Sequence, residues 1–180
     1  MKKQILLLPI LTLVFMFTSC TDDSDPVNEE EVITTMTVTL TPDTGGTDVV
    51  LQTRDLDGEG GEDPTVTVTG GPLTSGETYS GSIVLLNEID AENITEEIEQ
   101  EKEEHQFFFV IGSGLDVTTS YDDQDGNGNP VGLSFTLTAG SASGGDFTVT
   151  LRHEPNKPNT GINDAGGETD IEETFVITIQ

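Results

Sequence analysis

The chain has 180 residues, of which 34 are Asp or Glu and 6 are Lys or Arg, so its formal net charge at pH 7 is -28. This charge argues against nucleic acid as a partner, because phosphate contacts need clustered Lys and Arg, and it disfavours electrostatic binding to anionic lipid headgroups. It favours solubility and the attraction of cations or of a basic partner surface, although an acidic exterior alone would also explain it.

The first twenty residues have the pattern of a bacterial lipoprotein signal peptide at 1–19. Lys2 and Lys3 precede a 13-residue apolar run at 5–17, which is shorter than the roughly 20 residues that a membrane-spanning helix needs. Cys20, the only cysteine, follows Phe-Thr-Ser at the expected cleavage point. We expect processing before Cys20 and a membrane anchor of acyl chains such as palmitate on Cys20; a plain secreted protein is the alternative.

Residues 20–31 are polar and acidic and are typical of a tether, which leaves 32–180 as one domain. The processed chain keeps 4 basic residues against 34 acidic ones, a charge of about -30. Because its single cysteine is expected to carry lipid, no disulfide can form within the chain.

Strand patterns fill most of this domain. Within the run 34–40, residues 35–40 alternate strictly between threonine and apolar residues, which is typical of a half-buried strand. Residues 107–111 are apolar at every position, which indicates a central strand covered on both faces. Nine such runs, separated by Gly, Asp, Asn and Pro, lie at 34–40, 49–54, 65–69, 78–88, 105–111, 115–121, 131–139, 147–153 and 171–179.

Nine short strands at this spacing predict an all-β fold, an antiparallel immunoglobulin-like sandwich, with a small barrel as the alternative. One segment interrupts the strands. Residues 93–104 predict a short acidic helix of about three turns, with Asn93 and Glu96 as a capping box and with Ile94 and Ile98 facing the sheet.

The two histidines of the chain are candidate ligands for a transition metal. If the helix continues through His105, then Glu101 lies on the same face as His105. His153 ends the apolar face of its own strand and is followed by Glu154. Imidazole nitrogen together with carboxylate oxygen suits zinc or copper, so we predict a site of His105, His153, Glu101 and Glu154. The alternative is that His153 caps the edge of the core and that the glutamates are solvated.

Two loops place oxygen-bearing side chains at every second position, as the start of a calcium loop does. Asp55 and Asp57 belong to the first loop, and Asp123, Asp125 and Asn127 to the second. Neither loop has the glutamate that completes an EF-hand. The hypothesis is therefore a weaker calcium site, and the alternative is an ordinary turn rich in Asp, Asn and Gly.

Motifs for catalysis are sparse. The sequence contains no G-x-S-x-G elbow, no phosphate-binding loop followed by Lys and Ser or Thr, and no tryptophan for a sugar-binding platform. We therefore expect a protein that is not an enzyme.

Specific sequence blocks are spread over almost the whole processed chain: EEVITT at 30–35, RDLDG at 54–58, LNE at 86–88, ITEEI at 94–98, EHQFF at 104–108, GNPVGL at 128–133, TLRHEPNK at 150–157 and AGGETD at 165–170. With these blocks the chain resembles a family of Bacteroidota lipoproteins, especially of flavobacteria, whose members are often labelled type 1 periplasmic-binding-fold proteins. That label implies a two-lobed α/β fold, which the strand patterns argue against. The resemblance implies an outer-membrane lipoprotein encoded near a TonB-dependent transporter, and it implies no ligand residues.

The acidic stretch after Cys20 also resembles the export signal that sends lipoproteins of this phylum to the cell surface. The sequence thus predicts a surface-exposed binding module that is anchored in the outer membrane through Cys20. It would capture a divalent cation, or a ligand that carries one, for a transporter. The alternative function is a structural or protein–protein interaction module that calcium stabilises.

Overall fold

A computed structural model describes residues 31–58 and 60–180. The predicted signal peptide and Cys20, the expected site of lipidation, lie outside these residues. Within the described part of the chain, no helix has the length and apolar character required to cross a membrane.

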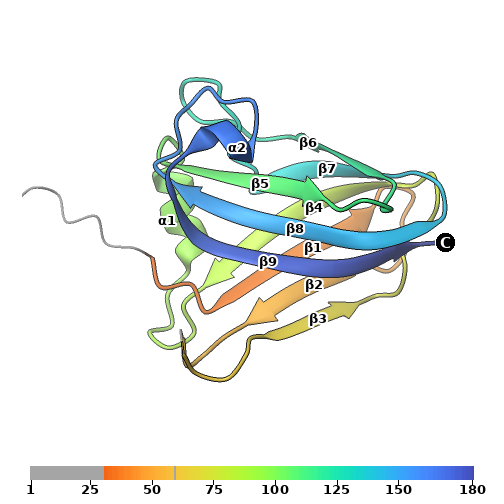
Figure 1. The fold of residues 1–180 in the computed structure, drawn as a ribbon, viewed down its shortest axis with the longest axis horizontal. Helices are drawn as coiled ribbons and strands as arrows, with labels where there is room; N and C mark the ends of the chain where they lie inside the picture. The colour runs from red at the N-terminus through yellow and green to blue at the C-terminus, as the bar shows by residue number, and fades with distance from the viewer. Residues whose placement is uncertain (1–30, 59) are drawn as a thin grey trace, which may run out of the picture.

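The described residues form nine strands and two short helices (Figure 1). In chain order these are β1 (Thr35–Pro42), β2 (Val49–Arg54), β3 (Thr65–Thr69), β4 (Thr78–Leu86), α1 (Ile94–Gln100), β5 (His105–Ile111), β6 (Val117–Tyr121), β7 (Ser134–Ala139), β8 (Ser143–His153), α2 (Ile162–Ala165) and β9 (Glu168–Ile179).

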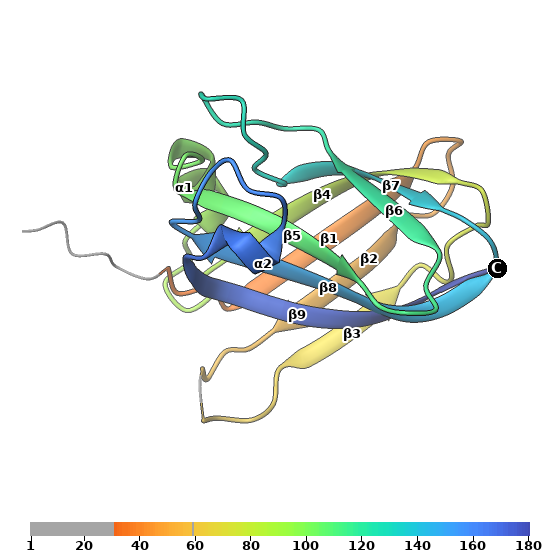
Figure 2. The same cartoon turned by 45° about the horizontal axis from the view of Figure 1, so that its top comes forward.

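The strands form two antiparallel sheets that face each other, as the two views of Figures 1 and 2 show. The order is β3-β2-β1-β4-β7-β6 in the larger sheet and β5-β8-β9 in the smaller one. Seven of these strands follow the A-B-E-D and C-F-G order of an immunoglobulin constant-type sandwich, with β1 as strand A and β9 as strand G. The β2–β3 hairpin is inserted after strand A, and α1 is inserted between strands B and C. The prediction of an all-β sandwich is confirmed. The expectation that residues 107–111 form a central strand covered on both faces is wrong, because β5 is an edge of the smaller sheet and Val110 is exposed.

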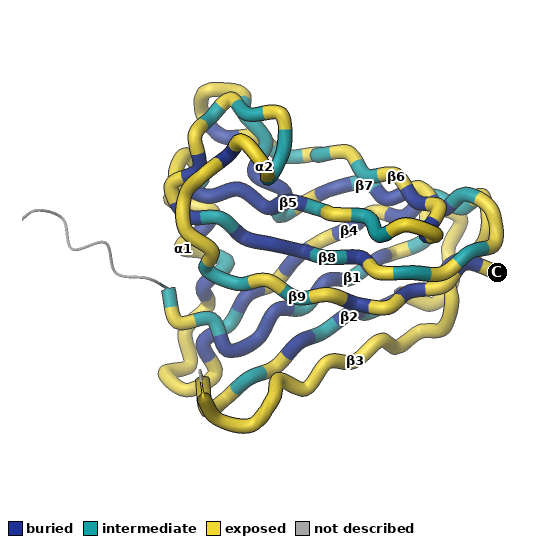
Figure 3. The backbone as a smooth tube through the Cα atoms, viewed as in Figure 1, coloured by how far each residue is buried: buried dark blue, intermediate teal, exposed yellow. Residues whose placement is uncertain are grey.

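The core lies between the sheets and is built by alternation along the strands (Figure 3). Met36, Val38 and Leu40 of β1 are fully buried, as the period-2 pattern predicted. Phe135 of the larger sheet and Phe147 of the smaller sheet belong to the same core, and burying each such ring contributes roughly 1.5–3 kcal/mol. All residues of β3 are exposed, because this strand forms the edge of the larger sheet.

The predicted helix is present but shorter than expected. α1 spans seven residues, and its buried residues are Ile94 and Ile98, the two that were predicted to face the sheet. Its last turn contains no basic residue, and Glu101 leaves the helical conformation, as expected where carboxylates oppose the helix dipole. The Asn93 side chain does not cap the helix; it donates a hydrogen bond to the Glu96 carboxylate instead.

Because α1 ends before Glu101, His105 is the first residue of β5 and not part of the helix. The expectation that Glu101 and His105 share one helical face is therefore wrong. The two residues are brought together by the turn at 101–104 that links α1 to β5.

Candidate metal centre

The two histidines of the chain lie directly opposite each other in the smaller sheet. His105 begins β5 and His153 ends β8, and they are paired in the antiparallel register of these strands. Their ring centroids are 4.6 Å apart, with the ring planes nearly perpendicular. This distance is set by the register of the two strands and could not be predicted from the sequence.

Two carboxylates that the sequence analysis did not select complete this cluster. Glu31 precedes β1 and was assigned to the tether, yet its side chain lies inside the sandwich beside both histidines. Asp170 belongs to β9, where the pairing with β8 shifts: Leu151 pairs with Ile171, but Arg152 pairs with Thr169. This bulge leaves Asp170 outside the ladder, and a bulge can re-aim a side chain in this way.

The four side chains form a compact, buried group. The ligand atoms of Glu31, His105, His153 and Asp170 all lie within 4.8 Å of one another. The exposed fractions of these side chains are 0% for His105, 1% for Asp170 and 7% each for Glu31 and His153. Four such groups could hold a metal ion, because each contributes a nitrogen or oxygen ligand to one point in a water-poor interior.

The distances within the group suit a small cation. His105 Nε2 lies 3.1 Å from Glu31 Oε1 and 3.9 Å from Asp170 Oδ2. His153 Nδ1 lies 3.5 Å from Glu31 Oε2 and 3.9 Å from Asp170 Oδ1. Ligand bonds of about 2.0–2.1 Å in a tetrahedral zinc site place ligand atoms roughly 3.3 Å apart, so these distances need only small adjustments.

The environment of His105 determines which of its nitrogens can bind a metal. Its Nδ1 lies 3.1 Å from the main-chain carbonyl oxygen of Glu101, and because a carbonyl only accepts, Nδ1 must be the donor. In the neutral ring Nε2 therefore carries a lone pair, and it faces the Glu31 carboxylate. Metal-binding histidines are commonly oriented by such a bond from the second nitrogen to a backbone carbonyl.

Hydrogen bonding alone leaves part of this cluster unsatisfied. Among the described residues, His105 Nε2, both ring nitrogens of His153 and Glu31 Oε2 are buried without an aligned hydrogen-bond partner. Buried polar atoms are normally paired, because an unpaired one costs about 1–3 kcal/mol. A lone pair that faces a carboxylate requires either a proton or a metal ion between the two atoms.

In the protein without metal, the electrostatics favour a proton between His105 and Glu31. Burial raises the pKa of Glu31, but its contact with His105 and the charges of both histidines outweigh burial, so this pKa falls to about 2. Burial lowers the pKa of His105, and the contact with Glu31 reverses the effect, so the net pKa is raised. Without an ion, the cluster therefore favours a protonated His105 beside ionised Glu31.

A buried amine supports the strand that presents His105. Lys157 Nζ donates to the carbonyl oxygens of His105, at 2.7 Å, and of Lys102, at 2.6 Å. It also lies 3.4 Å from the Asp125 carboxylate. These bonds connect the turn before β5 to the segment after β8, and so they help to fix the distance between the two histidines.

The predicted oxygen ligands Glu101 and Glu154 are not among the four residues. The Glu101 side chain is exposed, and its contribution is the carbonyl that orients His105. Glu154 is exposed as well, and it joins Glu104 and His153 in a second, more exposed group whose ligand atoms also lie within 4.8 Å of one another. The histidines of the prediction are thus brought together, but the buried carboxylates beside them are Glu31 and Asp170.

The predicted calcium loops use their carboxylates for other bonds. Asp125 accepts hydrogen bonds from the amides of Asn127 and Asn129. Its carboxylate also contacts the ammonium group of Lys157, which supplies the positive charge that a calcium ion would otherwise provide. Asp123 accepts from three backbone amides at 132–134. In the described residues, neither loop supplies a group of three or more acidic or histidine ligands.

The first of these loops is organised in the same way. Asp55 accepts from the amides of Asp57 and Gly58, and Asp57 accepts from the amide of Glu62. Both loops therefore have the internal hydrogen bonds of Asx-type turns. Calcium binding there remains a prediction without support from a cluster of free oxygens.

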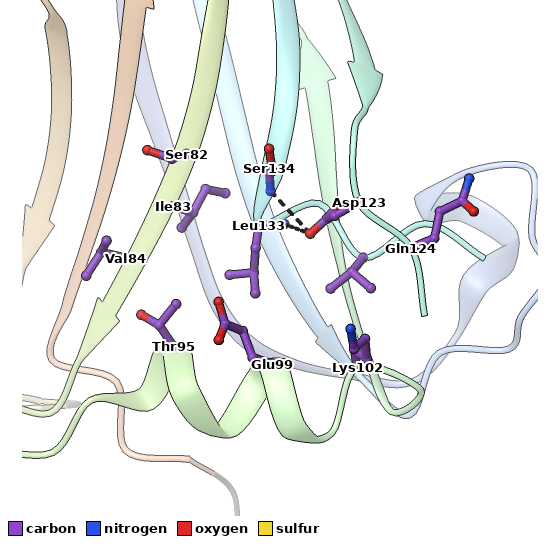
Figure 4. Close-up of a pocket in the computed structure, with 11 residues that line it drawn as sticks. Ser82, Ile83, Val84, Thr95, Glu99, Lys102, Asp123, Gln124, Leu133 and Ser134 are labelled. Atoms are coloured by element: carbon purple, nitrogen blue, oxygen red, sulfur yellow. Dashed lines mark hydrogen bonds between the residues drawn. The ribbon is translucent and has the colours of Figure 1, made fainter. Parts of the chain in front are cut away.

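A separate, largely apolar pocket of about 530 Å³ lies between α1, β4 and the segment before β7 (Figure 4). Glu99, Lys102 and Asp123 contribute polar groups to it, and Asp123 is held there by the amides of Leu133 and Ser134. None of its lining residues belongs to the four-residue cluster.

Comparison with protein-family models, with curated proteins and with solved structures gave no match. The chemistry of the site therefore has to be argued from its own residues.

Proposed function

We propose that this protein is a lipid-anchored envelope β-sandwich that binds one divalent transition metal ion, zinc above all, through Glu31, His105, His153 and Asp170. The observation that carries the proposal is that both histidines and two carboxylates are buried together, with their ligand atoms within 4.8 Å of one another. With neutral imidazoles, the two carboxylate charges balance the ion, so the filled site is electrically neutral.

The donor set favours zinc over calcium or magnesium. Two imidazole nitrogens suit zinc, copper and similar ions, whereas calcium and magnesium take oxygen ligands almost exclusively. Zinc also accepts the four-coordinate geometry that two histidines, one glutamate and one aspartate can provide. Copper is the second choice for the same donor set.

The burial of the ligands favours a role in holding the ion over catalysis. A catalytic zinc keeps one position open for water or substrate, whereas four protein ligands close the coordination sphere. Binding to the folded state alone also stabilises that state. Glu31 is the last residue of the expected tether, so a bound ion would join the end of that tether to β5, β8 and β9.

Within the envelope, we propose that the module retains a metal ion at the outer membrane and works beside a TonB-dependent transporter. The family resemblance supports this placement, and the charge of about -30 supports attraction of cations. The second candidate is a structural module for which the ion is a permanent brace, and the closed, buried ligand set favours it. Slow release of zinc to a strong chelator, over hours, would favour the structural module with a permanently bound ion.

Isothermal titration of the processed chain, freed of metal beforehand, tests the proposal. We expect one zinc ion per chain with a dissociation constant at or below the micromolar range, and loss of that binding in His153→Ala. Glu154→Gln is the matched control, because it removes a carboxylate of the sequence-based site but none of the four proposed ligands. Absence of zinc and copper binding by the wild-type protein would refute the proposed function.

A further inference from the structure

An acidic pocket adjoins the buried cluster. It has a volume of about 400 Å³ and lies between the start of the domain, the β4–α1 loop and α1. Five carboxylates line it, from Glu31, Asp90, Glu92, Glu97 and Glu101, and its lining includes no Lys, Arg or His among the described residues.

Glu31 belongs both to this pocket and to the buried cluster. Its side chain is more than nine-tenths buried, and its Oε2 atom has no hydrogen-bond partner among the described residues. Glu31 therefore lines the pocket, while its carboxylate oxygens contact His105 and His153. Glu31 thus lies between the other acidic residues of the pocket and the remaining members of the cluster, His105, His153 and Asp170.

The pocket carries a concentrated negative potential. Burial raises the pKa of Glu97, and the charges of Glu92, Glu31 and Glu101 raise it further, which shows that these carboxylates interact with one another. A concave site lined by one sign of charge concentrates counter-ions and can accelerate their association by 10-fold or more.

Building on the proposed metal centre, we infer that this pocket is the loading port through which a hydrated divalent cation reaches Glu31 and then the two histidines. Glu97 and Glu101 attract the ion electrostatically while it keeps its water shell. Glu31 is the first ligand to replace water, and His105, His153 and Asp170 complete the coordination. Glu97 and Glu101 thus determine how fast the site fills and are not ligands of the final complex.

The test compares two charge-matched double variants of the processed chain. Glu97→Gln/Glu101→Gln removes two carboxylates of the pocket. Neither side chain is hydrogen-bonded to another residue that the structure describes, so the fold should be retained. Asp48→Asn/Asp146→Asn removes two exposed carboxylates near the opposite end of the sandwich, where β2 and β8 begin. Both variants change the net charge by the same amount.

Rapid mixing with Zn²⁺ and a competing chromophoric indicator measures the loading rate, and Co²⁺ absorption reports the final coordination. At an ionic strength of 0.02 M, where the Debye length is about 20 Å, we expect the pocket variant to load at least about threefold more slowly than wild type. At 0.5 M, where the Debye length is about 4 Å, the two rates should converge. The tetrahedral Co²⁺ spectrum should be unchanged, and Glu97→Lys should load more slowly still.

Each outcome decides a separate point. A pocket variant that loads at the wild-type rate at low salt, or an equal slowing in the control variant, overturns the loading port and leaves the metal centre standing. A wild-type protein that binds neither Zn²⁺ nor Co²⁺ overturns the metal centre, and the port with it.

Discussion

The effect of Glu31→Gln on zinc binding should show whether the cluster is a metal centre or an ordinary buried ion pair. The substitution keeps the shape of the side chain but removes the carboxylate that contacts both His105 and His153. It also removes one of the two charges that would neutralise a bound ion. Loss of an outer-shell partner alone costs 10–100-fold in metal affinity, so loss of a ligand should cost at least about 100-fold.

The magnitude follows from mass action. At a free zinc concentration 100 times the dissociation constant, zinc stabilises the wild-type fold by about 2.7 kcal/mol. At the same concentration, a variant with 100-fold weaker binding gains only about 0.4 kcal/mol. For a domain of this size, about 1 kcal/mol shifts Tm by roughly 2–4 °C, so the zinc-dependent shift should fall from roughly 5–11 °C to about 1–2 °C.

Thermal unfolding followed by circular dichroism, with zinc and with a chelator, measures both shifts. Glu154→Gln should keep the full wild-type shift. If Glu31→Gln retains a shift of the wild-type size, Glu31 is not a ligand and the four-residue centre is wrong. If zinc fails to raise the Tm of the wild-type protein, the centre does not bind zinc to the folded state.

Three further predictions concern pH, the backbone and the core. The folded pKa of His105 is raised, so its ion pair with Glu31 stabilises the metal-free protein below about pH 6.5 and is lost as the pH rises through that raised pKa. Zinc requires unprotonated histidines, so the gain in Tm from zinc should instead increase from pH 6 to pH 8, and parallel trends with and without zinc would contradict this reasoning. Gly167→Ala should lower both Tm and zinc affinity, because φ is +73° there and a Cβ atom would lie 2.2 Å from the carbonyl oxygen of His153; titration calorimetry of a folded variant with unchanged affinity would argue against it. Phe135→Ala should cost about 3–5 kcal/mol in urea unfolding, because the ring is fully buried between the sheets, and a loss below about 1 kcal/mol would refute that account of the core.

The sequence was sufficient to predict the sandwich because strand identity is encoded locally. The alternation of threonine with Met36, Val38 and Leu40 specifies which face of β1 is buried without knowledge of any partner strand. The same holds for Ile94 and Ile98, whose spacing identified the buried face of α1. The length of α1 was predicted less well, since helix ends depend on the turn that connects the helix to the sheet.

The residues of the candidate metal centre could be predicted only in part, for a physical reason. His105 and His153 could be selected from their residue type, because the chain has no other histidine and imidazole is a favoured transition-metal ligand. Their partners could not be selected in that way from 34 acidic residues. Both Glu31 and Asp170 occur in blocks that carry the family resemblance, but no local pattern distinguished them from the solvated carboxylates.

What the chain determines by itself is local: which residues alternate, which segments turn and which side chains can bind a metal. What the tertiary structure decides is proximity across long separations in sequence. The β5–β8 register places two histidines side by side, a bulge in β9 directs Asp170 inward, and the segment before β1 inserts Glu31 between them. Strand register and bulges result from the packing of the whole sandwich, and for that reason the candidate ligand set became visible only in the folded chain.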